Sequence, residues 1–280
     1  MGYQEKLVGV FGDPVDENPT VVIMQAAFDA AKLPFRYLTI QVRRGDLKAA
    51  IEGMKAMNFS GINITMPFKR EVIQYLDEVS AAARTMNAVN CIYYKDGKLC
   101  GENTDGKGFM ESLRAGSVNV SGKNVTILGA GGVASAISVE LSHAGAKHIN
   151  IVNRSERGAE LAATVNQCSA TKAEYIRFES GYAVSADTDI LVNCTPVGFE
   201  DPTQKPDIDY DSIRSGMIVC DVIPNAISTG FLEEAKKRGC RTFCGLEMLV
   251  YQGVLGYEFW TGETPDIDVM LNALKKEYGF

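Results

Sequence analysis

Three short motifs in the N-terminal third of the chain carry side chains that could bind and transform a small polar molecule. They occupy residues 63–69 (NITMPFK), 87–90 (NAVN) and 102–106 (ENTDG). Asparagine and threonine both donate and accept hydrogen bonds, which suits a molecule with several hydroxyls. Lys69 and Asp105 add an ammonium and a carboxylate, groups able to move a proton. Each motif alone also fits turn formation or helix capping, which Asn, Thr and Asp favour.

Alternating strand and helix patterns surround these motifs. Apolar runs predict strands at 7–11, 35–42, 61–65 and 89–94, and apolar residues at helical spacing predict helices at 21–33, 45–57 and 73–82. The polar motifs therefore gather near strand ends. This alternation predicts a separate α/β domain for the N-terminal third.

A glycine-rich turn follows the next apolar strand, residues 125–128. Glycines and a small residue then occur in G-x-G-x-x-A spacing, before a helix to about His143 and a second strand at 149–152. Such glycines permit a tight turn and let a pyrophosphate approach the backbone at a helix N-terminus. The pattern predicts a dinucleotide site whose contacts are Gly129, Ala130, Gly131, Gly132, Val133 and Ala134.

The end of the second strand indicates which dinucleotide is bound. Many NAD sites carry an acid there, whereas this chain has Asn153, Arg154 and Ser155, with Arg157 shortly after. A guanidinium and small hydroxyls suit a 2′-phosphate. We therefore predict NADP(H) as the cofactor. Two alternatives stay open, a solvated loop arginine at Arg154 and use of both dinucleotides.

The remaining patterns complete two domains. Strands are expected at 175–178, 190–193, 217–222 and 242–244, and helices at 229–238, 250–260 and 266–277. We expect residues 1–105, completed by helices from 246–280, to form an α/β substrate-binding and catalytic domain. Residues 106–245 are expected to form a Rossmann-type domain, a doubly wound parallel sheet that binds NADP.

Composition excludes several classes of function. The formal charge of −7 argues against nucleic acid as a partner. No apolar run is long enough for a membrane span. The seven cysteines form no C-x-x-C pair, which favours reduced thiols in a cytoplasmic protein. With only two histidines, His143 and His148, we expect neither a histidine triad nor a metal site.

Taken together, the motifs resemble the shikimate dehydrogenase family, from Gly12 to Gly262. The matching segments are NITMPFK at 63–69, NAVN at 87–90, NTDGKG at 103–108, GAGGVASA at 129–136, NRSER at 153–157, NCTPVG at 193–198 and GLEMLVYQG at 245–253. The resemblance implies an active site in a cleft between two domains. It also implies reversible NADP-linked oxidation of a ring secondary alcohol, as in shikimate to 3-dehydroshikimate, and often a homodimer.

The resemblance further implies roles for single residues. Lys69 and Asp105 match the catalytic pair, without fixing which of them holds the proton at each step. Substrate hydroxyls are expected to bond to Asn63, Thr65, Asn90 and Gln252. The cofactor is expected near Thr195, Val222, Gly245 and Met248, and core packing is an equally good explanation for Met248.

Two segments depart from the family pattern. Where the family usually holds the substrate carboxylate with Ser-x-Ser, this chain offers Asn18 and Thr20, next to three acids, Asp13, Asp16 and Glu17. A nearby carboxylate would be repelled by these acids unless they face solvent. We therefore hypothesise that the carboxylate is held differently or that the natural substrate is not shikimate.

The second departure is Pro224, where the family commonly has tyrosine, followed by Ala226 in place of proline. Several alternatives thus stay open: a paralogue for quinate, an amino-shikimate or another hydroxylated ring compound, a non-catalytic NADP-binding regulator, and a folate-linked dehydrogenase with a catalytic lysine.

Overall fold

The computed structural model describes residues 4–280, and these form two compact units. The first contains the described residues up to Thr104 together with Val250–Phe280, and the second contains Asp105–Leu249. Two helices, α4 (Thr104–Ala115) and α8 (Gly245–Thr261), carry the chain across the unit boundaries.

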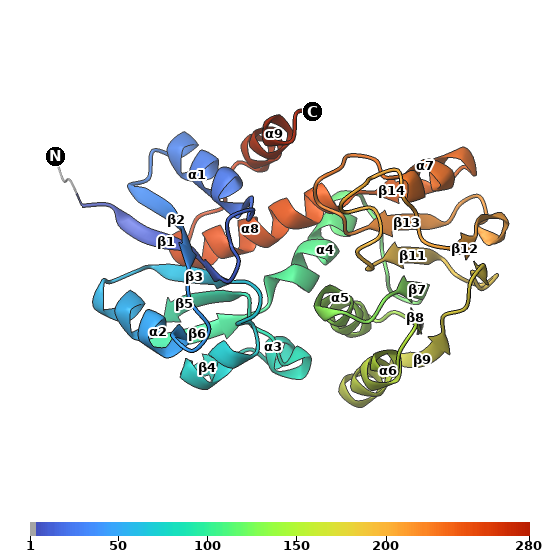
Figure 1. The fold of residues 1–280 in the computed structure, drawn as a ribbon, viewed down its shortest axis with the longest axis horizontal. Helices are drawn as coiled ribbons and strands as arrows, with labels where there is room; N and C mark the ends of the chain where they lie inside the picture. The colour runs from blue at the N-terminus through green and yellow to red at the C-terminus, as the bar shows by residue number, and fades with distance from the viewer. Residues whose placement is uncertain (1–3) are drawn as a thin grey trace. The chain divides into compact units, whose positions relative to one another are not determined.

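The first unit is built on a mixed sheet of six strands in the order β2-β1-β3-β5-β6-β4 (Figure 1). Its strands are β1 (Lys6–Gly12), β2 (Phe35–Gln41), β3 (Gly61–Ile64), β4 (Glu78–Val79), β5 (Cys91–Lys95) and β6 (Lys98–Glu102). Strand β1 pairs in parallel with β2 and β3, whereas β5 runs antiparallel to β3 and β6. The helices are α1 (Thr20–Ala30), α2 (Leu47–Ala56), α3 (Ala81–Met86) and α9 (Ile267–Glu277), with a short 3-10 helix η1 (Glu71–Tyr75).

Aromatic stacking joins the end of the chain to the core of the first unit. Phe28 of α1 is fully buried and stacks on Phe35 of β2, with ring centroids 4.9 Å apart, and on Tyr257 of α8, at 5.1 Å. Helix α9 lies beside α1 (Figure 1). Residues separated by more than two hundred positions therefore share one core.

The predicted helix at 73–82 is wrong. The structure instead has η1, then β4, then α3, which begins after its cap Ser80. Strand β4 pairs with β6, and the Asp77 carboxylate accepts a hydrogen bond from the Leu99 amide at 2.7 Å. Pairing with a strand that comes later in the chain therefore overrides the local helical spacing.

The second unit is a parallel sheet of six strands in the order β14-β13-β11-β7-β8-β9. The strands are β7 (Asn124–Leu128), β8 (His148–Asn153), β9 (Lys172–Arg177), β11 (Ile190–Asn193), β13 (Ile218–Asp221) and β14 (Arg241–Phe243), with a small separate sheet of β10 (Tyr182–Ala183) and β12 (Ile208–Asp209). Its helices are α4, α5 (Gly132–His143), α6 (Arg157–Cys168) and α7 (Gly230–Lys237), with a 3-10 helix η2 (Tyr210–Ser212). The strand order reverses beside β7, where α/β sheets bind their ligands. The predicted Rossmann-type fold is confirmed.

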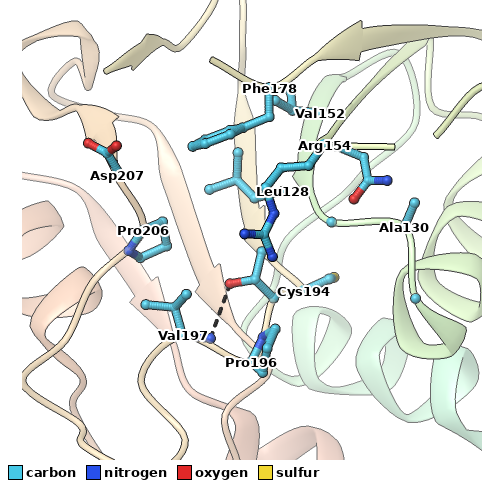
Figure 2. Close-up of a pocket in the computed structure, with 14 residues that line it drawn as sticks. Leu128, Ala130, Val152, Arg154, Phe178, Cys194, Pro196, Val197, Pro206 and Asp207 are labelled. Atoms are coloured by element: carbon cyan, nitrogen blue, oxygen red, sulfur yellow. Dashed lines mark hydrogen bonds between the residues drawn. The ribbon is translucent and has the colours of Figure 1, made fainter. Parts of the chain in front are cut away.

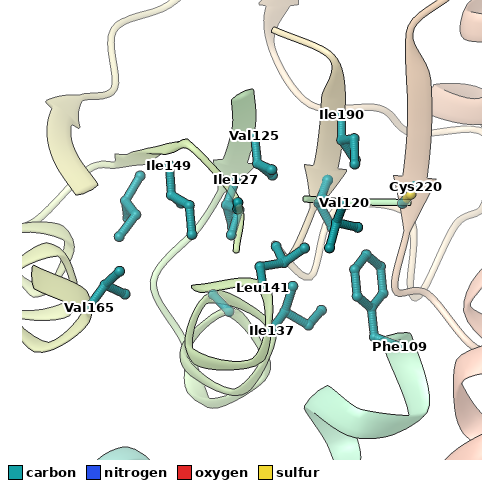
Figure 3. Close-up of a cluster of buried hydrophobic side chains, with 14 of the residues drawn as sticks. Phe109, Val120, Val125, Ile127, Ile137, Leu141, Ile149, Val165, Ile190 and Cys220 are labelled. Carbon is teal, nitrogen blue, oxygen red and sulfur yellow. The ribbon is translucent and has the colours of Figure 1, made fainter. Parts of the chain in front are cut away.

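The two faces of this sheet are covered by different helices because successive side chains of a strand point to opposite faces. Ile127 of β7 packs with Ile137 and Leu141 of α5 in one buried cluster (Figure 3). The next residue, Leu128, belongs to another cluster that includes Phe231 of α7. Both faces are thus closed, which explains why these strands read as continuous apolar runs.

Candidate functional site

A cavity of about 420 Å³ opens in the second unit, at the carboxyl ends of β7, β8 and β11 (Figure 2). Gly129 lies in its wall at φ +104°, and a Cβ there would sit 2.9 Å from the Cys194 carbonyl oxygen. Around Gly131 there is nothing within 4 Å of where a Cβ would lie, and α5 begins at the next residue. The start of α5 therefore lies beside open space at the cavity, where its first backbone amides could bind an anionic group.

The strand after the glycine turn brings a cation to the same cavity. Asn153 and Arg154 both line it, and Figure 2 shows the Arg154 side chain extending toward Cys194 and Pro196. The Asn153 amide closes the turn, since Nδ2 donates to the Ser155 carbonyl at 2.9 Å and to its Oγ at 3.0 Å. The residues lining the cavity do not include Ser155 or Arg157.

Thr195 lines the cavity as expected, and a buried polar network fixes its loop. The Thr195 hydroxyl donates to Asn193 Oδ1 at 2.7 Å, and Asn193 Nδ2 donates to Asp221 Oδ1 at 3.0 Å. Thr229 Oγ1 donates to the other Asp221 oxygen at 2.6 Å. Burial raises the pKa of Asp221, and the bonds from Thr229, the Ile223 amide and Asn193 oppose that rise. Asn193 and Asp221 were not predicted, although both end buried strands.

The remaining predicted cofactor residues lie outside the cavity lining. Ala134 is fully buried and, like Met248 at 8% exposure, belongs to the hydrophobic cluster around β7. Gly132 and Val133 form the first turn of α5, and Val222 is partly buried against the same cluster. At Gly245 a Cβ would lie 2.4 Å from the Ile223 carbonyl oxygen, so close packing requires glycine.

In the first unit, four predicted or neighbouring polar side chains form one hydrogen-bonded group. Asn63 Nδ2 donates to the Asn90 carbonyl at 3.1 Å, and Asn90 Oδ1 accepts from the Thr104 amide at 2.6 Å. Thr104 Oγ1 lies 3.4 Å from Gln252 Oε1. The structure therefore brings Asn63, Asn90 and Gln252 together. Thr104, which is fully buried between them, lies in the motif at 102–106 singled out from the sequence, although no individual role was assigned to it there.

The three N-terminal motifs are tied to one another through the backbone. The Val89 amide donates to the Lys69 carbonyl at 2.8 Å, and the Asn90 amide donates to the Glu102 carbonyl at 3.0 Å. Thr65 is half-buried directly after β3. Lys69 is half-buried in the first unit, whereas Asp105 stands in the first turn of α4, in the second.

The segment at 13–20 forms a turn at the start of α1. Asn18 Oδ1 accepts a hydrogen bond from the Thr20 amide at 3.0 Å, and Thr20 is buried. Asp13 accepts from Gln41 Nε2 at 3.0 Å and lies 4.0 Å from Arg44 Nε. The side chain of Asn18 thus turns an acceptor toward an amide at the helix start.

Comparison with known proteins covers most of the chain. Three family models match the chain. The shikimate dehydrogenase substrate binding domain matches residues 10–92, the shikimate / quinate 5-dehydrogenase model matches residues 112–198, and the shikimate 5'-dehydrogenase C-terminal domain matches residues 245–275. The NADP(+) shikimate dehydrogenase of Desulforamulus reducens is 39% identical over 97% of this chain and 95% of its own. The chain belongs to the shikimate dehydrogenase family.

Solved structures of similar proteins have the same fold. The 5-ketofructose reductase of Gluconobacter sp. strain CHM43 has a TM-score of 0.96 at 43% identity, covering 99% of this chain and 100% of its own. Shikimate 5-dehydrogenase from Listeria monocytogenes, solved with shikimate and NAD, has a TM-score of 0.92 at 32% identity, covering 100% and 98%. The predictions of an oxidoreductase of the shikimate dehydrogenase type and of NADP as cofactor are confirmed.

Two kinds of feature are absent from residues 4–280. None of the helices described there is long and apolar enough to cross a membrane. Nor does that part of the chain contain a group of three or more His, Cys, Asp or Glu side chains suited to a metal ion.

Proposed function

We propose that this protein catalyses reversible hydride transfer between NADP(H) and a secondary alcohol on a polyhydroxylated ring. The second unit would bind the dinucleotide and the first unit the ring. The observation that carries this proposal is the family match over 97% of the chain, together with the presence of both Lys69 and Asp105 in their motifs.

The cavity in the second unit suits the dinucleotide. The turn at 129–131 and the start of α5 would hold the pyrophosphate, while Arg154 and Asn153, which line the cavity, would hold the 2′-phosphate. Ser155 and Arg157, which follow directly in the chain but lie outside the lining, would assist them. Bound NADP supplies the nicotinamide that accepts or donates the hydride. Thr195, Val222, Gly245 and Met248 would lie on the nicotinamide side.

Lys69 and Asp105 would perform the proton chemistry. An ammonium stabilises the oxyanion that develops on the reacting oxygen, and a lysine in its neutral form accepts the hydroxyl proton. Asp105 would supply the companion carboxylate. Asn63, Thr65, Asn90 and Gln252 would bond to the other hydroxyls, where a lost buried partner costs about 1–3 kcal/mol.

Shikimate and 3-dehydroshikimate are the first candidate substrates, because the curated relative named above is a shikimate dehydrogenase. An uncharged ketose is a second candidate, and a specific observation favours it. Asn18 turns its oxygen toward the Thr20 amide, in a segment that also holds Asp13, Asp16 and Glu17, so this place suits a hydroxyl better than a carboxylate. The similarity to 5-ketofructose reductase agrees with this second candidate.

Nicotinamide absorbance tests both candidates in parallel. NADP⁺ reduction is followed with shikimate and quinate, and NADPH oxidation with 3-dehydroshikimate and 5-ketofructose. With whichever substrate turns over, Lys69→Ala should lower kcat by about 10²–10⁴-fold and leave NADPH binding intact. The exposed Lys55→Ala serves as the matched control. Full activity in Lys69→Ala, or no turnover by a wild-type protein that binds NADPH, would refute the proposal.

We also propose a cytoplasmic homodimer. None of the seven cysteines, which all lie within the described residues, is in a disulfide, and this agrees with a reducing compartment. Light scattering at several protein concentrations measures the mass, and a monomer at all of them would contradict the dimer.

A further inference from the structure

A buried tyrosine contacts the hydrogen-bonded set of side chains in the first unit that includes Asn63 and Asn90. Tyr37 of β2 is 3% exposed, and its hydroxyl donates to Asn63 Oδ1 at 2.9 Å. Burial raises the pKa of Tyr37 well above its ordinary value, so the hydroxyl keeps its proton and remains a donor. The Tyr37 ring also lies beside Trp260, at 6.2 Å between centroids, and Trp260 is fixed by its bond to the Ile92 carbonyl.

These contacts determine which way the Asn63 carboxamide faces. The Asn90 carbonyl can only accept, so it requires the amide nitrogen of Asn63 on its side. Tyr37 then donates to the oxygen on the other side. A reversed carboxamide would place two oxygens against each other at Asn90. The bond to Asn90 uses one of the two hydrogens on Asn63 Nδ2, and the second remains for a further acceptor.

We propose that Tyr37 is a positioning residue for substrate recognition: its hydroxyl holds the Asn63 carboxamide so that Nδ2–H donates to an oxygen of the ring substrate. This inference rests on the proposed function, in which Asn63 contacts the substrate. The χ2 torsion of asparagine is broad, so the orientation of this amide depends on its partners. Removal of the Tyr37 hydroxyl leaves Asn63 Oδ1 without its donor, and the amide is then held only by its bond to the Asn90 carbonyl, which restrains its rotation less.

A double-mutant cycle tests the coupling. Tyr37→Phe and Asn63→Ala should each lower kcat/KM for the ring substrate, Tyr37→Phe by about two- to tenfold, mainly through KM. NADPH affinity should not change. In the Asn63→Ala background, Tyr37→Phe should have no further effect, because its action passes through Asn63. Additive losses, or unchanged kinetics in Tyr37→Phe where Asn63→Ala is impaired, would overturn the proposal.

The matched control is Tyr257→Phe, which removes the hydroxyl of another buried tyrosine in the same unit and should leave KM unchanged. A melting curve for each variant separates lost stability from lost recognition. NMR of the side-chain amides provides a readout independent of turnover. The chemical shifts of the Asn63 NH₂ group should change in Tyr37→Phe and remain unchanged in Tyr257→Phe.

The two proposals fail in different ways. A wild-type protein that binds NADPH but turns over none of the four candidate substrates would contradict the proposed function, while the NMR comparison would still decide the role of Tyr37. Unchanged Asn63 resonances in Tyr37→Phe would refute the positioning role whatever the activity.

Discussion

Arg154 is the side chain through which we expect the second unit to distinguish NADP(H) from NAD(H). It lines the cavity next to the glycine turn. Hydrogen bonds to a charged group contribute about 1.5–3 kcal/mol, so Arg154→Ala should raise KM for NADP⁺ roughly 10- to 150-fold. KM for NAD⁺ should barely change, because NAD⁺ lacks the 2′-phosphate.

Arg177→Ala is the control for this prediction. Arg177 ends the neighbouring strand β9, its side chain is 70% exposed, and its ion pair with Glu156 is long at 3.9 Å. Such exposed pairs contribute little, so this variant should bind NADP⁺ normally. If Arg154→Ala raised KM for NADP⁺ and NAD⁺ equally, Arg154 would support the fold of the site and would not select the 2′-phosphate.

Sequence reasoning found the residues that carry a local pattern and missed their buried partners. Gly129 and Arg154 stand at fixed places around a strand–turn–helix, so spacing alone singled them out. Tyr37 and Asp221 carry no such pattern, and Thr104 lies in the motif at 102–106 without an assigned role. Each is defined by a hydrogen bond to a group far away in the sequence, such as Tyr37 to Asn63. Their roles therefore became visible only with the fold.

Close packing between two helices of the second unit can be tested at Gly106. A Cβ at this position of α4 would lie 2.4 Å from the Ala136 carbonyl oxygen of α5, and backbone cannot yield as a flexible side chain would. Gly106→Ala should therefore push α4 from α5 and lower the free energy of unfolding by about 1–3 kcal/mol. Chemical denaturation measures the change.

Gly53→Ala is the matched control, since Gly53 also lies inside a helix, α2. The nearest atom to its added Cβ is the flexible Met57 Cε at 3.9 Å. The free energy of unfolding of this variant should rise by about 0.5–1 kcal/mol, because alanine has a higher helix propensity than glycine. The prediction for Gly106 would be wrong if both variants gained stability alike.

Strands were predicted correctly where burial alone determined the run of apolar residues. Strands β7 and β11 are buried on both sides of a covered sheet, and each reads as an apolar run. The prediction of a helix at 73–82 was wrong because β4 forms through its pairing with β6, and the local spacing of apolar residues does not encode that pairing. Residues 157–168, for which no element was predicted, form α6.

At the scale of the whole molecule, we expect dinucleotide binding to appear in thermal unfolding. A ligand that binds only the folded state adds about 2.7 kcal/mol at 100 times its Kd. For a unit of this size that corresponds to a rise of roughly 5–10 °C in Tm. NADPH should produce such a shift in calorimetry, and NADH at the same concentration a much smaller one.

Arg154→Ala provides the control for this measurement, because it should abolish the difference between NADPH and NADH. Equal shifts with the two dinucleotides in the wild-type protein would contradict the assignment of the 2′-phosphate to this site. The measurement needs no substrate, so it tests the cofactor assignment separately from the reaction.

The sequence by itself determined the fold class, the family and the cofactor. Strand burial, the glycine turn and the basic strand end are local patterns that spacing reveals. Tertiary structure alone decided how Asn63, Asn90, Thr104 and Gln252 bond to one another. It also decided that the Asn63 nitrogen faces the Asn90 carbonyl and the Asn63 oxygen faces Tyr37. It also showed that Asn18 uses its oxygen at the start of α1. The reason is physical: hydrogen bonds between distant segments depend on where the chain returns, and burial then makes each partner obligatory.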